Sequence, residues 1–208
     1  MAVYGLDIET DTGAGGLDPA RCRILAAAVA GDDGTTVLTG PEPRLLGALD
    51  EHVAGLGPAV LVTWNGSGFD LPFIAERARR CGVATGLRLR LDPGIVRSHP
   101  PLAGHEGSYR AAWHGAVHLD AYLAYRSLLA GTGLSCSLKA AARRAGLAVV
   151  DADASKVHEL SAHQLVRYVA SDAALAMALA VARWDRVRDF GDGPLPVRAP
   201  APLLSRTG

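Results

Sequence analysis

Two acidic side chains near the end of an apolar segment are the first residues here whose types and spacing could do chemistry. Asp7 and Glu9 belong to or follow the β-prone run 3–8, which is typical of a buried strand. Side chains two apart in a strand point to the same face, so these carboxylates would lie side by side. A bound divalent cation would remove the cost of burying two anions together. The alternative is that the strand ends at Ile8 and both acids are solvated.

Two later segments carry further acids in positions that suit a shared site. Asn65 and Asp70 bound a short segment between a predicted strand and a predicted helix. Tyr168 and Asp172 are four residues apart on a predicted helix, so they share one face with Cβ atoms about 5–6 Å apart. Taken alone, Asp70 is also compatible with a helix cap and Asp172 with an exposed helix face.

In chain order the three segments have the patterns Asp-x-Glu, Asn-x-x-x-Phe-Asp and Tyr-x-x-x-Asp. They resemble the motifs of the DEDD (DnaQ-like) superfamily of 3′–5′ exonucleases, and most closely those of the proofreading exonuclease domain of family B DNA polymerases, the tyrosine subtype. The resemblance covers roughly residues 3–181, and 117–120 and 136–139 are similar to segments that separate the second and third motifs in that family. No polymerase portion follows, so we expect a stand-alone nuclease.

The resemblance implies hydrolysis of phosphodiesters from the 3′ end of single-stranded nucleic acid, with release of nucleoside 5′-monophosphates. Two divalent cations, Mg²⁺ or Mn²⁺, roughly 3.5–4 Å apart would stabilise the attacking and leaving oxygens. Such hard cations prefer carboxylate oxygens and water. The implied metal ligands, which are also catalytic, are Asp7, which would bridge both ions, Glu9, Asp70 and Asp172. The implied fifth catalytic residue is Tyr168, which would orient the attacking water.

The same resemblance implies substrate contacts outside the acids. Thr10 and Leu17 would contact the terminal nucleotide and Asn65 the strand nearby. DNA is the preferred substrate, because the motifs are most similar to those of proofreading domains. RNA stays open, because related families with the same four acids trim RNA and no residue here identifies a group that reads the 2′-hydroxyl. A non-catalytic nucleic-acid-binding module of the same fold and an RNase H-like endonuclease stay open as well.

The hydrophobic pattern predicts the elements that would position these residues. Strands are expected at 3–8, 24–30, 35–38, 60–64, 87–91 and 117–120, and helices at 41–56, 70–81, 121–129, 137–145 and 160–184. Short turns join the first three strands, which indicates an antiparallel meander, and strand–helix pairs follow. We expect an α/β, RNase H-like fold with a five-stranded mixed sheet, helices on both faces and the first strand in the centre.

Three further features bear on the surroundings of the site. Residues 95–112 are rich in Pro, Gly and His and are expected to form a long surface loop. Asp120 follows a strand, so it would either cap the next helix, the favoured interpretation, or join the metal site. Arginines after the second motif form either a solvated helix face or a basic wall for phosphates; they are Arg77, Arg79, Arg80, Arg88, Arg90 and Arg97.

Composition limits the broad class of the protein. The chain has 208 residues, 49% of them hydrophobic, and a net charge of zero, which fits one globular domain without strong non-specific affinity for polyanions. No segment approaches the roughly 20 apolar residues that span a membrane. The lack of a signal-like N-terminus and three scattered cysteines favour the cytoplasm. We expect a domain at 1–189 and a loosely ordered tail at 190–208.

Overall fold

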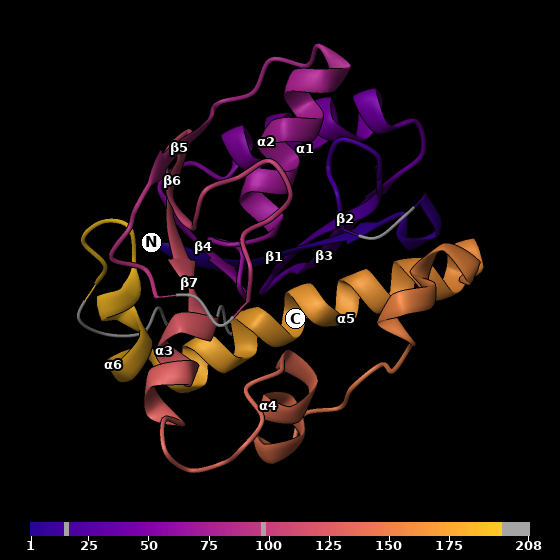
Figure 1. The fold of residues 1–208 in the computed structure, drawn as a ribbon. Helices are drawn as coiled ribbons and strands as arrows, with labels where there is room; N and C mark the ends of the chain where they lie inside the picture. The colour runs from indigo at the N-terminus through magenta and orange to yellow at the C-terminus, as the bar shows by residue number, and fades with distance from the viewer. Residues whose placement is uncertain (15–16, 97–98, 197–208) are drawn as a thin grey trace, which may run out of the picture.

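A seven-stranded mixed sheet forms the centre of the molecule, in the strand order β3-β2-β1-β4-β7-β6-β5 (Figure 1). The computed structural model describes residues 1–14, 17–96 and 99–196. The strands are β1 (Ala2–Thr10), β2 (Ile24–Gly31), β3 (Gly34–Thr39), β4 (Ala59–Thr63), β5 (Leu87–Leu91), β6 (Tyr109–Trp113) and β7 (Ala116–Asp120). The first three form the expected antiparallel meander, and β1 and β4, like β4 and β7, are parallel.

The expectation of five strands is wrong. Strand β6 lies partly within the segment 95–112 that was expected to be a loop, and it pairs antiparallel with both β5 and β7. Its five residues include two alanines and one arginine, so it lacks the β-branched composition that predicts a strand. The position of β6 is instead determined by its pairing with a strand on each side. Through β6, β5 also joins the edge of the sheet.

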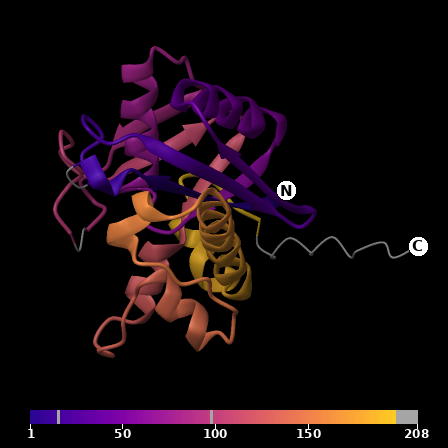
Figure 2. The ribbon, with the colours of Figure 1, turned by 90° about the vertical axis from the view of Figure 1, so that its right-hand side faces the viewer.

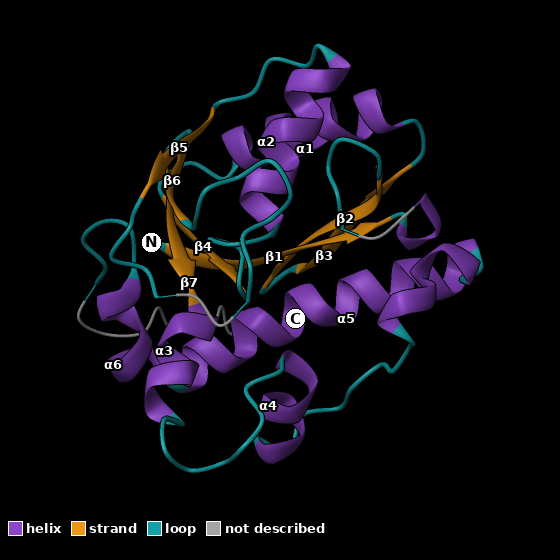
Figure 3. Cartoon of the chain, viewed as in Figure 1, coloured by secondary structure: helices purple, strands orange, loops and turns teal. Residues whose placement is uncertain are grey.

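Helices cover both faces of the sheet, as expected (Figures 2 and 3). On one face, α1 (Glu42–Gly55) and α2 (Asp70–Cys81) pack on a core that includes Leu6, Ile8 and Ile24. On the other face the helices are α3 (Ala121–Leu128), α4 (Leu138–Arg144), α5 (Ala162–Ala182) and the single-turn α6 (Trp184–Val187). Short 3-10 turns, η1 (Thr12–Ala14), η2 (Ala154–Glu159) and η3 (Arg188–Phe190), complete the fold.

The alternation of side chains along β1 decides where its acids point. Leu6 and Ile8 pack in the core on the α1–α2 side. Gly5 faces α5, because a Cβ built on it would lie 1.9 Å from the carbonyl oxygen of Ala173. Asp7 and Glu9 share the parity of Gly5, so both carboxylates face α5.

The sequence was expected to contain no segment that could span a membrane. By length and composition alone, however, the long helix α5 could do so. Residues Ala162–Ala182 have a mean hydropathy of 1.6 over the most apolar window. In the structure, however, α5 lies along β1 and β2, where Val169 and Ala173 are fully buried against alanines of β2. Its apolar composition is accounted for by this position in the core.

The first described residues after the predicted domain boundary at 189 are attached to the sheet. Gly191 forms an isolated antiparallel bridge with Leu119 of β7, and the backbone N–H of Asp192 donates to the carbonyl oxygen of His118 at 2.8 Å. The Trp184 indole N–H donates to the Pro196 carbonyl oxygen at 2.9 Å. Residues 197–208 of the predicted tail lie outside the described residues.

Candidate metal centre

Three carboxylates from two distant segments meet where β1 faces the middle of α5. Asp7, Glu9 and Asp172 each place one oxygen within 4.8 Å of the others. Asp7 and Glu9 come from the end of β1, where a register shift between Glu9 and Thr10 marks a β-bulge. Asp172 comes from α5, next to the residue whose carbonyl packs against Gly5. The close approach of strand and helix at Gly5 therefore brings the three acids together.

The pKa values of these acids show how unfavourable their charges are without a cation. Burial, followed by the charges of Glu9, Asp70 and Asp172, raises the pKa of Asp7 well above its usual range. Burial and the charges of Asp172 and Asp70 raise the pKa of Glu9 to about 8. Burial also raises the pKa of Asp172, against the opposing effect of Lys139. These groups would ionise together only with added positive charge.

Asp70 lies at the margin of this cluster. It is the first residue of α2 and is 4% exposed. Its carboxylate accepts hydrogen bonds from its own backbone N–H and from that of Ile8, and burial raises its pKa to about 7. Its charge acts on both Asp7 and Glu9, although it is outside the set whose oxygens lie within 4.8 Å. The fourth predicted acid is thus adjacent to the other three.

Lys139 is a basic residue of the site that the sequence analysis did not single out. Its ammonium group forms an ion pair with Asp172, donates to the carbonyl oxygen of Val150 at 3.0 Å and lies 4.3 Å from the centre of the Tyr168 ring. Ser137 caps α4 and fixes the start of the helix that carries it. No spacing pattern relates a residue on α4 to α5, so only the similarity of 136–139 to the exonuclease family could have drawn attention to it.

Tyr168 is one turn before Asp172 on α5 and is 5% exposed. Burial and the charges of Glu9, Asp172 and Asp7 raise the pKa of its phenol above the ordinary value. The hydroxyl is therefore protonated at neutral pH. In this state it can position a water molecule by hydrogen bonding.

The three predicted substrate contacts lie in different environments. Thr10 is 3% exposed at the bulge that ends β1, whereas Leu17 is 53% exposed and directly follows residues 15–16, which the structure does not describe. Asn65 has a positive φ of 71° in the turn between β4 and α2. Its carbonyl oxygen accepts from the N–H groups of Gly68 and Phe69 at 3.0 Å each. The roles of all three residues stay predictions.

Asp120 has the geometry of a cap. Its side chain accepts hydrogen bonds from the backbone N–H groups of Asn65, Ser67 and Tyr122 at 2.9, 3.0 and 3.1 Å. It thereby begins α3 and holds the turn that leads to Asp70. Of the two interpretations of Asp120, the cap is the one that these contacts support.

A buried hydrogen-bond chain supports the same turn from the other side. The Asp192 carboxylate lies 2.8 Å from Nδ1 of His118, and Nε2 of His118 lies 2.8 Å from the Thr63 hydroxyl oxygen. That hydroxyl oxygen accepts from the backbone N–H of Gly66 at 3.2 Å. Thr63 is fully buried, so the chain links the C-terminal segment to the turn and offers no nucleophile to solvent.

Three of the arginines after the second motif are paired with acids, and the structure does not decide between the two interpretations of the whole set. Arg77 makes an ion pair with the buried Glu42 at 2.5 Å, and Arg79 and Arg80 both bind Glu76. Their charges are largely matched within α1 and α2. Arg88 and Arg90 are exposed on β5, and Arg97 lies outside the described residues.

Comparison with known proteins gives evidence on the family that is independent of this geometry. The family described as DNA polymerase family B, exonuclease domain, matches residues 29–141, which is just over half of the 208 residues. The chain belongs to this family of exonuclease domains. The matched range includes Asn65 and Asp70, whereas Asp7, Glu9, Tyr168 and Asp172 lie outside it. The position of these four residues in one site therefore comes from the structure alone. No curated protein matches the chain.

The family B DNA polymerase from the hyperthermophilic archaeon Pyrobaculum calidifontis has a similar structure, with a TM-score of 0.67 and 24% sequence identity. The alignment covers 86% of this chain and 24% of that chain. The likeness shows a shared fold, which is consistent with the RNase H-like exonuclease fold expected from the sequence. This family B exonuclease domain therefore corresponds to about a quarter of that polymerase.

The residues of this exonuclease domain fit divalent cations. Oδ2 of Asp7 is a buried oxygen with no hydrogen-bond partner among the described residues. Such an atom is costly to bury unless something binds it. The surrounding donors are carboxylate oxygens, with no thiol or imidazole in the group. A donor set of this kind suits a hard cation such as Mg²⁺ or Mn²⁺.

Proposed function

We propose that this protein is a metal-dependent 3′–5′ exonuclease that hydrolyses single-stranded nucleic acid, with DNA preferred. Membership of the exonuclease family supports the reaction class. The observation that carries the proposal is the meeting of Asp7, Glu9 and Asp172 around a buried oxygen that lacks a partner. The sequence predicted a unit at 1–189, and the contacts of Gly191 and Asp192 with β7 extend it past that boundary. The proposed unit acts on 3′ ends inside the cell.

In the proposed site Asp7, Glu9 and Asp172 hold the cations, and Asp70 contributes directly or through water. Two bound divalent cations supply Lewis-acid activation of water and stabilise negative charge around the phosphorus. A cation at Asp172 would compete with Lys139 for the same carboxylate. The balance of charge favours this exchange, because four acids here face one ammonium group.

The reaction forms one bond and breaks one bond at phosphorus. Oxygen from water bonds to the phosphorus while the bond to the 3′ oxygen of the preceding nucleotide breaks. The products are a nucleoside 5′-monophosphate and a strand that ends in a new 3′-hydroxyl. Tyr168 orients the water through its hydroxyl. The proton that the attacking water loses passes to solvent, and the leaving 3′ oxygen takes a proton from solvent to become the hydroxyl.

Strands labelled at the 5′ end test the proposal. Single-stranded DNA and RNA of one sequence are incubated with the protein in Mg²⁺, Mn²⁺ or a chelator. We expect a ladder that shortens from the 3′ end, faster on DNA and absent with chelator. Asp7→Asn should abolish the ladder, whereas Asp33→Asn, the same change in the exposed β2–β3 turn, should not. This pair excludes a contaminating nuclease.

The same assay separates this proposal from the functions that compete with it. Binding without cleavage in any of the metals would indicate a non-catalytic module. Internal cuts would indicate an endonuclease. A faster ladder on RNA would keep the site and replace DNA with RNA as the preferred substrate.

A further inference from the structure

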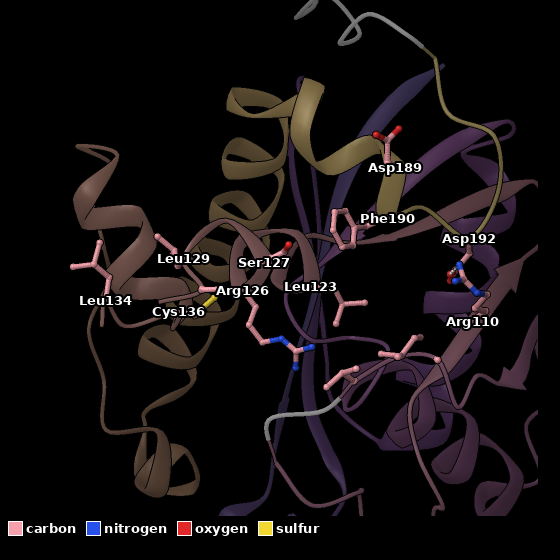
Figure 4. A pocket seen from close by; sticks show the side chains of 14 residues that line it. Arg110, Leu123, Arg126, Ser127, Leu129, Leu134, Cys136, Asp189, Phe190 and Asp192 are labelled. Atoms are coloured by element: carbon pink, nitrogen blue, oxygen red, sulfur yellow. Dashed lines mark hydrogen bonds and ion pairs between the residues drawn. The ribbon is translucent and has the colours of Figure 1, made fainter. Parts of the chain in front are cut away.

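A large cavity, lined by none of the candidate metal ligands, has no part in the chemistry described so far. It has a volume of about 690 Å³. Its walls come from α3, residues 94–96 and residues 189–192 (Figure 4). Pockets of roughly 300–1,000 Å³ hold drug-sized ligands, and a nucleotide is a ligand of that size.

A second, smaller cavity lies between this cavity and the turn that precedes Asp70. The smaller cavity, of about 30 Å³, is lined in part by three residues of the β4–α2 turn: Asn65, Ser67 and Gly68. Three residues line both cavities: Val96, Leu123 and Arg126. The two cavities are therefore adjacent along α3.

Sheet topology places these cavities and the acids at the same edge of the sheet. Strands β1, β4 and β7 run parallel, so their carboxyl ends meet at one edge of the sheet. Asp7 and Glu9 lie at this end of β1, the Asn65 turn follows β4, and α3 follows β7. In α/β sheets this edge is where ligands bind.

Among the described residues, Arg126 is a cation that lines both cavities and could bind a ligand there. No ion pair to its guanidinium is present in the part of the chain that the structure describes, and the guanidinium lies 5.9 Å from the centre of the Tyr122 ring. Arg110, by contrast, is held by Asp92 at 2.6 Å and by Asp192 at 3.2 Å. Figure 4 shows Arg126 extending from α3 into the space.

The rest of the lining combines apolar side chains with two carboxylates, Asp189 and Asp192, of which Asp192 is paired with Arg110. Leu123, Leu129 and Phe190 line the cavity, and Val96 is 70% exposed at its rim. Half-buried apolar side chains beside an arginine that lacks an ion pair among the described residues suit a ligand that combines flat apolar rings with an anionic group. Single-stranded nucleic acid has this composition at every nucleotide.

We propose that the cavity binds a nucleotide of the single strand on the 5′ side of the cleaved bond. Arg126 contacts a phosphate, and Leu123 and Phe190 contact a base. The inference rests on the proposed function: with the 3′ end at the acids, the strand that leaves along the Asn65 turn is upstream. Arg126 thus determines how strongly the protein prefers longer strands.

The test compares substrate lengths in Arg126→Gln, with Arg44→Gln as the matched control. Arg44 is exposed on α1 and lines neither cavity. Binding is measured in chelator, as the dissociation constants of 5′-labelled oligothymidylates from dinucleotide to dodecamer. Cleavage of the same strands is measured in Mn²⁺, as kcat/KM. For the dodecamer, Arg126→Gln should weaken binding about 5-fold and reduce the slope of log affinity against log salt by about 0.7. Both variants should bind the dinucleotide like wild type, and Arg126→Lys should recover part of the loss.

Two results would overturn the inference. Equal behaviour of Arg126→Gln and Arg44→Gln at every length would remove Arg126 from the strand path. If Arg126→Gln lost the same factor of affinity at every length, including the dinucleotide, the substitution would be acting on the fold or on binding of the cleaved nucleotide. Either result is compatible with a wild-type protein that shortens strands from the 3′ end, so the proposed function would stand. A wild-type protein that neither binds nor cuts would remove both.

Discussion

Asp7 combines two properties that are in conflict in the metal-free protein. Its Oδ2 is buried without a partner, and its charge is opposed by Glu9, Asp70 and Asp172. Asp7→Asn removes that charge while preserving the shape of the side chain. We therefore expect turnover to fall by about three orders of magnitude or more, with an unfolding temperature in chelator equal to or above that of wild type. Thermal unfolding and strand-shortening assays measure the two effects, and a lower unfolding temperature would contradict this account of Asp7.

The same conflict predicts how pH affects stability. The pKa of Glu9 is raised from 4.5 to about 8 in the folded protein, and that of Asp70 from 3.8 to about 7. A raised pKa means that the folded state holds protons more tightly than the unfolded state, so stability is lost as pH rises through the folded pKa. In chelator, the unfolding temperature should fall between pH about 5 and about 8.5.

Divalent cations should reverse this trend, because they bind the deprotonated acids. The rise in unfolding temperature on adding Mn²⁺ should therefore grow over the same pH range. Scanning calorimetry at several pH values, with chelator and with Mn²⁺, gives both curves. A Mn²⁺ effect that did not depend on pH would show that the cation binds elsewhere. Asp7→Asn is the control, since its response to Mn²⁺ should be weak throughout.

Tyr168 can be separated from the metal ligands by removing one oxygen atom. Tyr168→Phe keeps the ring that packs near Lys139 and loses only the hydroxyl. We expect kcat to fall about 10- to 100-fold while the Mn²⁺ dependence of the unfolding temperature is unchanged. An unchanged kcat would remove the hydroxyl from the mechanism.

At the residue scale, the sequence predicted which side chains share a face when they lie two to four residues apart. Asp7 and Glu9 are linked by strand alternation, and Tyr168 and Asp172 by one helical turn, so the structure places each pair as expected. Lys139 has no such link to its partner, because the two residues are 33 apart and lie on different helices. Contacts of this kind depend on how helices pack, which local pattern does not specify.

At the element scale, the segment after α6 acts as a clamp on the second motif. The Asp192 carboxylate contacts His118, the backbone N–H of Ala111 at 2.8 Å and the guanidinium of Arg110. Asp192→Ala leaves the buried His118 ring and the Ala111 N–H without this acceptor, while Arg110 keeps its ion pair with Asp92. We expect a loss of about 2–3 kcal/mol in the free energy of unfolding and faster proteolysis after residue 189.

The control for this clamp is Asp185→Ala, which removes an aspartate whose side chain is 77% exposed. It should leave the free energy of unfolding within about 0.5 kcal/mol of wild type. Urea denaturation and limited proteolysis of both variants measure the difference. Equal stability of the two variants would show that Asp192 is not a structural anchor.

Element by element, the sequence located every long helix and all strands except β6. The strands it located have apolar or alternating patterns, whereas β6 is defined by neighbours on both sides rather than by its own composition. The Pro- and Gly-rich composition after residue 189 likewise contains no signal for the contacts of Asp192. Both features are held by residues far away in sequence, so local propensity could not predict them.

At the scale of the whole molecule, the site exists because two layers of the fold approach closely at one point. The mixed sheet and the helices on both faces followed from the order of strands and helices in the sequence. The close approach of α5 to β1 could not be predicted in this way, because it depends on Gly5 having no side chain opposite the Ala173 carbonyl. A glycine in a strand usually weakens it, unless another part of the backbone approaches closely.

Gly5→Ala tests this approach directly. The added Cβ would lie 1.9 Å from the carbonyl oxygen of Ala173, so strand and helix must separate. We expect a loss of about 3 kcal/mol, or roughly 6–12 °C in unfolding temperature, together with weaker Mn²⁺ binding because Asp7 and Asp172 move apart. In Gly47→Ala, the control on α1, the new methyl group meets nothing within 4 Å and should stabilise the helix by about 0.5–1 kcal/mol. If Gly5→Ala unfolded at the wild-type temperature and bound Mn²⁺ normally, α5 would not pack closely against β1 at Gly5. The packing that brings Asp172 to Asp7 and Glu9 would then be wrong.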